Sequence, residues 1–174
     1  MLSRTRTLVI VAALASGASA VQASDVERLA ASLARWKDAR ESCGGDYSYK
    51  VIRSSFTGAR AETTVVVKAN KVVERRFDTA SPPLPGAPAP LKMEWSETGD
   101  DIGAHQGAAE PRTLDELYAI AKQIVEGKIP EHHVSSLGLD DRGLLQHCFV
   151  RDTRIQDDAP LAGVAPISLT LGGK

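Results

Sequence analysis

The sequence predicts an α+β fold in which an antiparallel sheet has two amphipathic helices packed on one face. Two segments place apolar residues three and four positions apart, so each helix has a single apolar stripe to bury. The β-prone segments mostly alternate apolar and polar residues, as strands do when a sheet is covered on one face. Nothing requires parallel strands, and the expected order is helix, three strands, long loop, helix, three strands.

The first helix is expected to begin after Ser24 and to end near Arg40. Ser24 and Glu27 have the S-x-x-E spacing of a capping box, in which each side chain satisfies a free backbone N–H group of the other residue. Gly44 and Gly45 then break the helix. Its apolar stripe consists of Val26, Leu29, Leu33 and Trp36.

Three strands are expected next, over residues 47–51, 62–68 and 72–77. The first alternates apolar and polar residues, and the other two are rich in β-branched side chains. Asn70 lies between the second and third strands and tolerates the left-handed conformation of a tight turn. The sequence therefore predicts a hairpin here without fixing its register.

A Pro-rich and acidic loop is expected over residues 80–111. Residues 80–91 contain five prolines, which cannot donate the hydrogen bonds of a sheet and favour extended conformations. A short strand is expected over residues 91–95. Residues 96–110 are polar, acidic and glycine-containing, and we expect them to be mobile.

The second helix is expected to begin after Thr113, which forms a T-x-x-E capping box with Glu116, and to end at Gly127. One face of this helix is apolar and consists of Leu114, Leu117, Tyr118, Ala121, Ile124 and Val125. Burial of this face against the sheet is the expected source of its stability.

Three further strands are expected over residues 132–137, 144–150 and 164–171. The first two flank a polar turn at residues 140–143. The last contains Pro166, which implies an edge position because proline has no backbone N–H to donate.

Residues 1–23 have the pattern of a secretory signal peptide. Two arginines precede a short apolar run, and small residues then offer cleavage after Ala20 or after Ala23. Residues 24–174 are expected to form a single exported α+β domain that is periplasmic or secreted. No later segment has the roughly 20 apolar residues that a bilayer requires, so no membrane span is expected.

Charge and motif content narrow the function classes. Cleavage after Ala23 would leave a net charge of −3, which argues against a nucleic-acid-binding protein. The chain has no G-x-S-x-G or S-x-x-K pattern for nucleophilic catalysis and no glycine-rich phosphate loop. The sequence therefore predicts no catalytic residue and no cofactor.

Cys43 and Cys148 are the two cysteines of the chain. Because exported proteins fold in an oxidising compartment, we expect them to form a disulfide bond. Closing a loop of this length would stabilise the fold by about 4 to 5 kcal/mol in the chain-entropy model.

Three histidines near the predicted hairpin could carry chemistry. If His133 faced His147 across the two strands, the pair could bind a metal ion with a nearby carboxylate, or act together with Asp141. His132 is adjacent to His133 and points to the opposite face. A slip of one residue in register would separate the pair, in which case these are solvated strand histidines.

The hairpin segment is basic. Residues 47–77 carry a net charge of +5, whereas residues 94–116 carry −6. The cations Lys68, Lys71, Arg75 and Arg76 could contact an acidic partner protein or an envelope polymer. Alternatively, the acidic loop lies near the basic hairpin, or the charges simply lie on solvated faces.

Several short motifs are spread along the chain: Trp36, Tyr47-Ser48-Tyr49, residues 65–67, the helix start at 113–118, Asp141-Arg142-Gly143, residues 148–152 and residues 156–158. Together these motifs resemble a family of small exported bacterial domains of unknown function. The resemblance spans most of the exported chain and implies an exported bacterial protein with a helix-and-sheet fold. That family often carries cysteines at the segment matching residues 54–57, where this chain has none.

The sequence thus favours a non-catalytic exported domain that acts by binding, with the basic hairpin and the proline-rich loop as contact surfaces. The alternative is a small periplasmic hydrolase or metal-binding protein that uses His133, His147 and Asp141.

Overall fold

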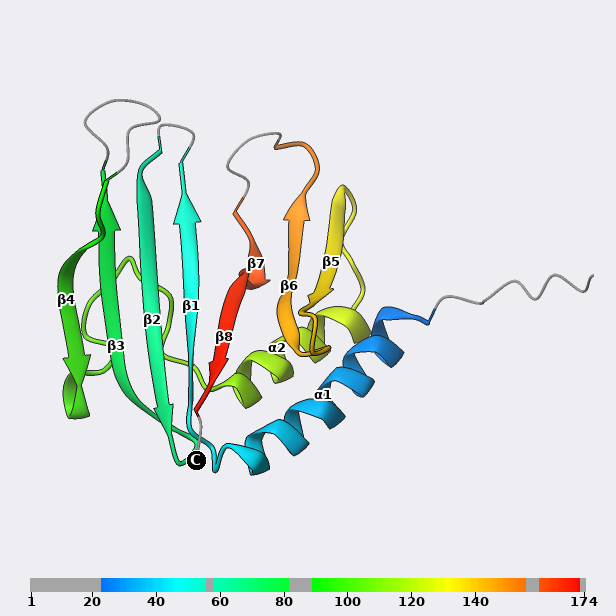
Figure 1. Cartoon of the computed structure of the whole chain (residues 1–174). Coiled ribbons are helices and arrows are strands. Elements are labelled where there is room, and N and C mark those ends of the chain that lie inside the picture. The colour runs from blue at the N-terminus through cyan, green and yellow to red at the C-terminus, as the bar shows by residue number, and fades with distance from the viewer. Residues whose placement is uncertain (1–22, 56–57, 82–88, 156–159, 173–174) are drawn as a thin grey trace, which may run out of the picture.

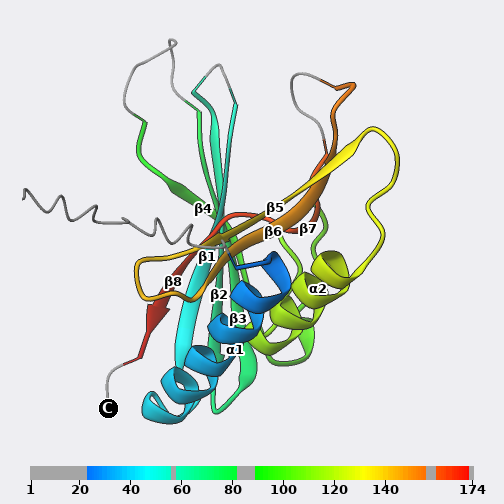
Figure 2. The ribbon, with the colours of Figure 1, turned by 90° about the vertical axis from the view of Figure 1, so that its right-hand side faces the viewer.

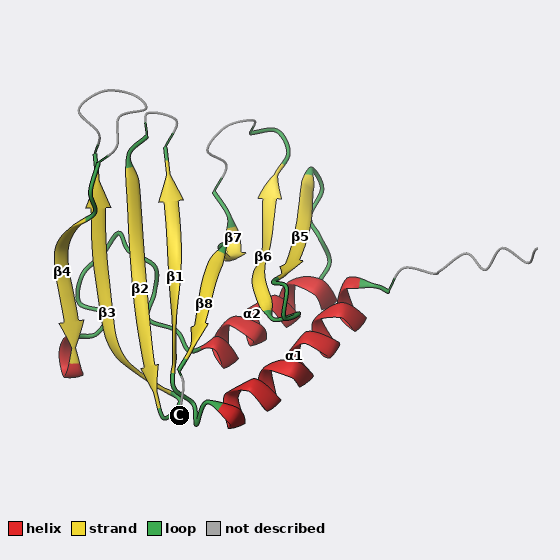
Figure 3. Cartoon of the chain, in the orientation of Figure 1, coloured by secondary structure: helices red, strands yellow, loops and turns green. Residues whose placement is uncertain are grey.

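The structure is a computed structural model that describes residues 23–55, 58–81, 89–155 and 160–172. Its elements confirm the predicted α+β class and the order helix, strands, helix, strands (Figures 1 and 3). In chain order they are α1 (Asp25–Ser42), β1 (Tyr47–Ser54), β2 (Arg60–Lys68), β3 (Lys71–Ala80), β4 (Lys92–Thr98), the short 3₁₀ helix η1 (Gly99–Asp101), α2 (Leu114–Glu126), β5 (His133–Leu139), β6 (Leu145–Asp152), β7 (Ala162–Val164) and β8 (Ile167–Leu171).

The described strands form two antiparallel sheets rather than one. The larger sheet has the order β4-β3-β2-β1-β8, and the smaller has the order β5-β6-β7. The strand expected over residues 164–171 is therefore two strands, with Ala165 and Pro166 between them. Because proline cannot donate a ladder hydrogen bond, the chain leaves β6 there and joins β1 instead. The expected edge position is confirmed, since β7 and β8 each end the order of their sheet.

Both helices begin as the capping boxes predict. Ser24 Oγ accepts a hydrogen bond from Glu27 N, while Ser24 N donates to the Glu27 carboxylate at 2.8 Å. Thr113 and Glu116 repeat this exchange at the start of α2, which ends at Gly127. Neither described helix is long and apolar enough to cross a membrane.

The two helices lie next to each other and pack against one face of each sheet (Figure 2). Trp36 of α1 meets the ring of Tyr47 in β1 edge to face, with ring centroids 4.9 Å apart. On the other side, the Tyr118 hydroxyl of α2 accepts a hydrogen bond from Leu145 N of β6 at 2.9 Å. Trp36 and Tyr118 are fully buried, whereas Leu33 and Ile124 are half-buried against this core.

The turn between β2 and β3 consists of Ala69 and Asn70, which both have positive φ angles, so the predicted hairpin is confirmed. Its register places Tyr49, Val65, Arg75 and Glu97 in one row across β1, β2, β3 and β4. We call the face that carries this row the inner face, because Tyr49 on it is buried under the segment that leads into α2.

Residues 96–110 are not the free loop that the sequence suggested. Strand β4 continues to Thr98, the 3₁₀ helix follows, and the chain then crosses the inner face of β3 and β2 on its way to α2. The most proline-rich residues, 82–88, lie outside the described residues, as do residues 1–22 of the expected signal peptide.

The expected disulfide between Cys43 and Cys148 is wrong, since both cysteines are free and buried. Cys43 caps the C-terminal end of α1, where its Sγ lies 3.5 Å from Arg40 O. Cys148 belongs to β6 and points under α2, with its Sγ 3.7 Å from Ala121 O. Each thiol thus occupies its own part of the core, and burial raises the pKa of Cys148 to about 11.

Candidate functional site

The histidine site proposed from the sequence does not form. The register of β5 and β6 pairs His133 with Asp152 and places His147 opposite Gly138, so the two imidazoles do not face each other. The His147 ring lies across Gly138, where an added Cβ would be only 2.1 Å from the ring, and its Nε2 is 3.0 Å from Ser136 Oγ.

Asp141 lies in the exposed turn between β5 and β6, and it does not form a metal-binding group with His133 and His147. Within the described residues, no group of three or more histidine, cysteine, aspartate or glutamate side chains is arranged to hold a metal ion. A metal or hydrolase site built on His133, His147 and Asp141 therefore has no geometric support.

The basic hairpin also differs from expectation. Arg75 is 3% exposed and cannot contact a partner, because it lies on the inner face and pairs with Glu97. Lys68 is exposed and bonds to Asp46 at 3.1 Å, and Arg76 bonds to Asp78 at 2.9 Å. Lys71 is exposed at the start of β3.

A half-open cleft of about 460 Å³ lies where the two sheets diverge. Its walls are the inner face of β1, helix α2, the β7–β8 segment and residues 108–112 of the segment before α2. The larger aliphatic lining residues are Val51, Leu117, Ile120, Leu161, Val164 and Ile167. This volume falls within the range of about 300–1,000 Å³ that is typical of small-molecule sites.

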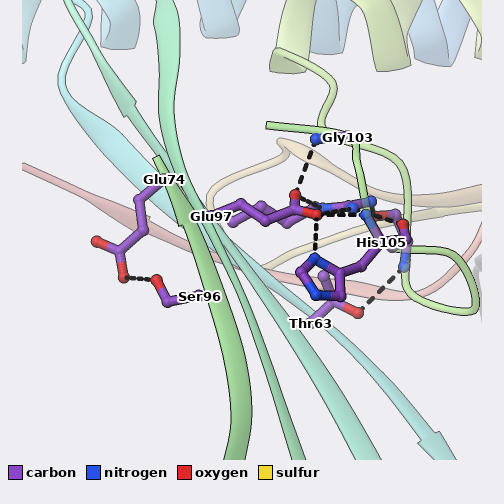
Figure 4. A network of polar contacts seen from close by, with 8 residues as sticks. Thr63, Glu74, Ser96, Glu97, Gly103 and His105 are labelled. Carbon is purple, nitrogen blue, oxygen red and sulfur yellow. Dashed lines mark hydrogen bonds and ion pairs between the residues drawn. The ribbon is translucent and has the colours of Figure 1, made fainter. Parts of the chain in front are cut away.

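One wall of the cleft is held by a buried ion pair (Figure 4). Arg75 Nε and Nη2 donate to the two Glu97 carboxylate oxygens at 2.7 and 2.8 Å, and both side chains are at most 3% exposed. Glu97 also accepts hydrogen bonds from Gly103 N at 2.8 Å and from His105 N at 2.6 Å. The bonds to Arg75 in particular hold the pKa of Glu97 far below its usual range.

Aromatic stacking completes this anchor. His105 stacks on Trp95 with ring centroids 4.5 Å apart, and Trp95 stacks on Phe77 at 5.4 Å. The Arg75 guanidinium lies 5.0 Å from the Trp95 ring centre, within cation–π range. Arg75 also donates to the carbonyl oxygens of His105 and Ala109, so the segment is bound at two points along its path.

The end of the segment nearest α2 is fixed by the sheet. Ala109 N donates to Thr63 Oγ1 at 3.1 Å, and the Tyr49 hydroxyl donates to Arg112 O at 2.7 Å. Burial raises the pKa of Tyr49 well above its usual range, so this hydroxyl remains a donor at neutral pH. Residues 108–112 therefore form a fixed wall of the cleft.

Two arginines lie at the mouth of the cleft. Arg53 follows Tyr49 and Val51 at alternate positions of β1, so it points to the same inner face, and it is exposed. Arg112 pairs with Glu110, and the side chains of the two residues are 40% and 69% exposed. Among the described residues, Arg53 has no ion-pair partner within bonding distance.

Sequence reasoning missed the cleft and its anchor. The sequence predicts a short strand for Trp95, a mobile loop for Glu97 and His105, and a possible partner contact for Arg75. The usable signal was the opposite net charge of the hairpin and of the segment after it. The interpretation that the acidic loop lies near the basic hairpin is confirmed by the bonds of Arg75 to Glu97 and His105.

No family model matches the chain, and no curated protein or solved structure is significantly similar to it. The resemblance to a family of exported bacterial domains therefore stays a prediction. Function has to be inferred from the cleft and its charges.

Proposed function

We propose that this protein is a non-catalytic exported domain that binds a small ligand with an apolar body in the cleft between its two sheets. The observation that carries the proposal is the combination of an apolar floor, fixed walls and an open mouth. Sites of this kind bury most of a small ligand with little rearrangement, because the walls are already in place.

The buried polar groups near the cleft support binding rather than catalysis. Both carboxylate oxygens of Glu97 are engaged by Arg75 and by backbone N–H groups, so this carboxylate is not free to accept a proton from a substrate. The Tyr49 hydroxyl is likewise committed to Arg112 O. These groups shape the wall of the cleft.

Contact with a partner protein or an envelope polymer remains a second part of the proposal. Within the basic hairpin it depends on Lys68, Lys71 and Arg76, since Arg75 is buried, and the proline-rich loop remains the second expected contact surface. Export to the periplasm or beyond is supported by the pattern of residues 1–23.

Binding of a neutral apolar dye, N-phenylnaphthylamine, tests the cleft. Leu161 lines its mouth and is 42% exposed, so Leu161→Asp places a carboxylate in the apolar site at little cost to folding. We expect the dissociation constant of the dye to rise by about tenfold, because apolar contact with the ligand is lost.

The matched control is Val134→Asp on β5, since Val134 is 44% exposed and does not line the cleft. This variant should bind the dye as the unmodified protein does. Equal loss in both variants, or no saturable binding of the dye to the unmodified protein, would refute the cleft as the binding site.

A further inference from the structure

We infer that the ligand of this cleft is a single-chain anionic amphiphile of the fatty-acid type, and that Arg53 selects its acidic head group. The inference rests on the proposed function and adds the chemical class of the ligand. It follows from the placement of charge around the cleft: two of its lining residues are arginines and one is an acid, with apolar residues below them.

Arg53 is the cation best placed to bind the anionic head group. It is the inner-face residue of β1 that follows Val51 towards the open end of the strand, so it lies directly beyond the apolar floor. Its neighbours in register on β2 and β3 are Ala61 and Thr79, neither of which carries a charge. Among the residues that the structure describes, Arg53 has no carboxylate partner. An arginine in this position, at the mouth of an apolar cleft, offers its guanidinium to an anion from outside.

Arg112 adds a second cation that a ligand can reach. Its backbone is fixed by the Tyr49 hydroxyl, whereas its side chain is held by Glu110, an acid that is 69% exposed. An ion pair between side chains as exposed as these contributes little to stability, so an incoming carboxylate can replace Glu110 at small cost. Of the described residues that line the cleft, Arg53 and Arg112 are cations and Glu110 is an acid, so their summed charge is positive.

The apolar floor determines the chemistry of the rest of the ligand. Val51, Val164 and Ile167 are buried, and Leu117 lies beside them on α2, so the side chains that form this floor are apolar. A buried polar group of the ligand would lose its bonds to water there without replacement. A ligand with a hydrocarbon chain and one anionic end can place its chain on the apolar floor and its charge beside the arginines at the mouth.

Displacement of N-phenylnaphthylamine by three amphiphiles with the same chain tests the inference: dodecanoate, dodecanol and dodecyltrimethylammonium, each below its micelle concentration. We expect dodecanoate to bind about tenfold more tightly than dodecanol, since it gains a charge-assisted hydrogen bond. The cation should bind more weakly than either. Raising the salt concentration should reduce the preference for dodecanoate.

Arg53→Gln should remove most of this preference by weakening dodecanoate about tenfold while leaving dodecanol unchanged. Arg53→Lys keeps the positive charge and should therefore retain part of the preference for dodecanoate. Arg151→Gln is the matched control, because Arg151 is an exposed strand arginine that does not line the cleft. Circular dichroism and the thermal midpoint establish that each variant is folded.

The outcomes separate the two proposals. Equal binding of dodecanoate and dodecanol overturns the anionic ligand, while the cleft remains a binding site. An Arg53→Gln variant that keeps the preference for dodecanoate overturns the role of Arg53 in selecting the head group. Failure of the dye and of all three amphiphiles to bind overturns the cleft itself.

Discussion

Replacing Glu97 with glutamine tests whether the buried ion pair holds the wall of the cleft. The two carboxylate oxygens have different partners: Oε1 accepts from Arg75 Nη2 and His105 N, and Oε2 accepts from Arg75 Nε and Gly103 N. Glutamine can keep only one of these sets. Its NH₂ group would face N–H donors on the other side, and the Arg75 charge would remain buried without a counter-charge.

The magnitude follows from this geometry. Removing one partner of a buried ion pair costs about 3–5 kcal/mol, because the other charge is left uncompensated. For a chain of this size such a loss lowers the thermal midpoint by roughly 6–20 °C. We also expect faster amide hydrogen exchange at Gly103 and His105, whose N–H groups lose their acceptors.

Glu74→Gln is the matched control, since Glu74 precedes Arg75 on β3 and lies on the opposite face, where Ser96 Oγ is 3.3 Å from its carboxylate (Figure 4). This variant should change the free energy of unfolding by less than about 0.5 kcal/mol. The assay is chemical denaturation of both variants at neutral pH. A Glu97→Gln variant no less stable than Glu74→Gln would refute the reasoning.

Three further predictions concern protons and thiols. Because the pKa of Glu97 is lower in the folded protein, the contribution of Glu97 to stability should be constant above about pH 5 and fall progressively below about pH 4.5, and a Glu97→Gln variant should show a shallower fall. Burial raises the pKa of Tyr47 to about 12, so stability should also fall between about pH 10 and pH 12, and an ultraviolet titration should show tyrosines that ionise late. Cys43 and Cys148 should both react with a thiol reagent after denaturation, while the native protein should react slowly; recovery of no free thiol from the unreduced protein would contradict this.

The parts of the fold that sequence reasoning predicted well depend on neighbours in the chain. A capping box needs residues three positions apart, as at Ser24 and Glu27, and the turn at Asn70 needs one residue that tolerates positive φ. These signals are local. The splitting of the last strand at Pro166 also has a local cause, but which sheet each half joins is decided by distant strands.

The candidate site depended on distant pairings and was mostly missed. Glu97 meets Arg75 through the register of β3 and β4, which no pattern in either strand specifies. The prediction of a disulfide was wrong for a related reason. The compartment decides whether two neighbouring thiols are oxidised, whereas the fold decides whether the two cysteines come close together. A disulfide needs Cβ atoms about 3.5–4.5 Å apart. Cys43 and Cys148 are buried under different elements.

The pairing of β8 with β1 has a consequence for how quickly the chain reaches its native state. Tyr47 is in register with Leu171, so the larger sheet is completed by a contact between residues more than a hundred positions apart. The β1–β2–β3 hairpins can form early because their loops are short, but β1 keeps an open edge until β8 arrives. Bringing such distant strands together costs loop-closure entropy, and this cost slows folding in proteins rich in non-local contacts. Until then the floor residue Ile167 has no place on β1, so the cleft is among the last parts of the protein to be assembled.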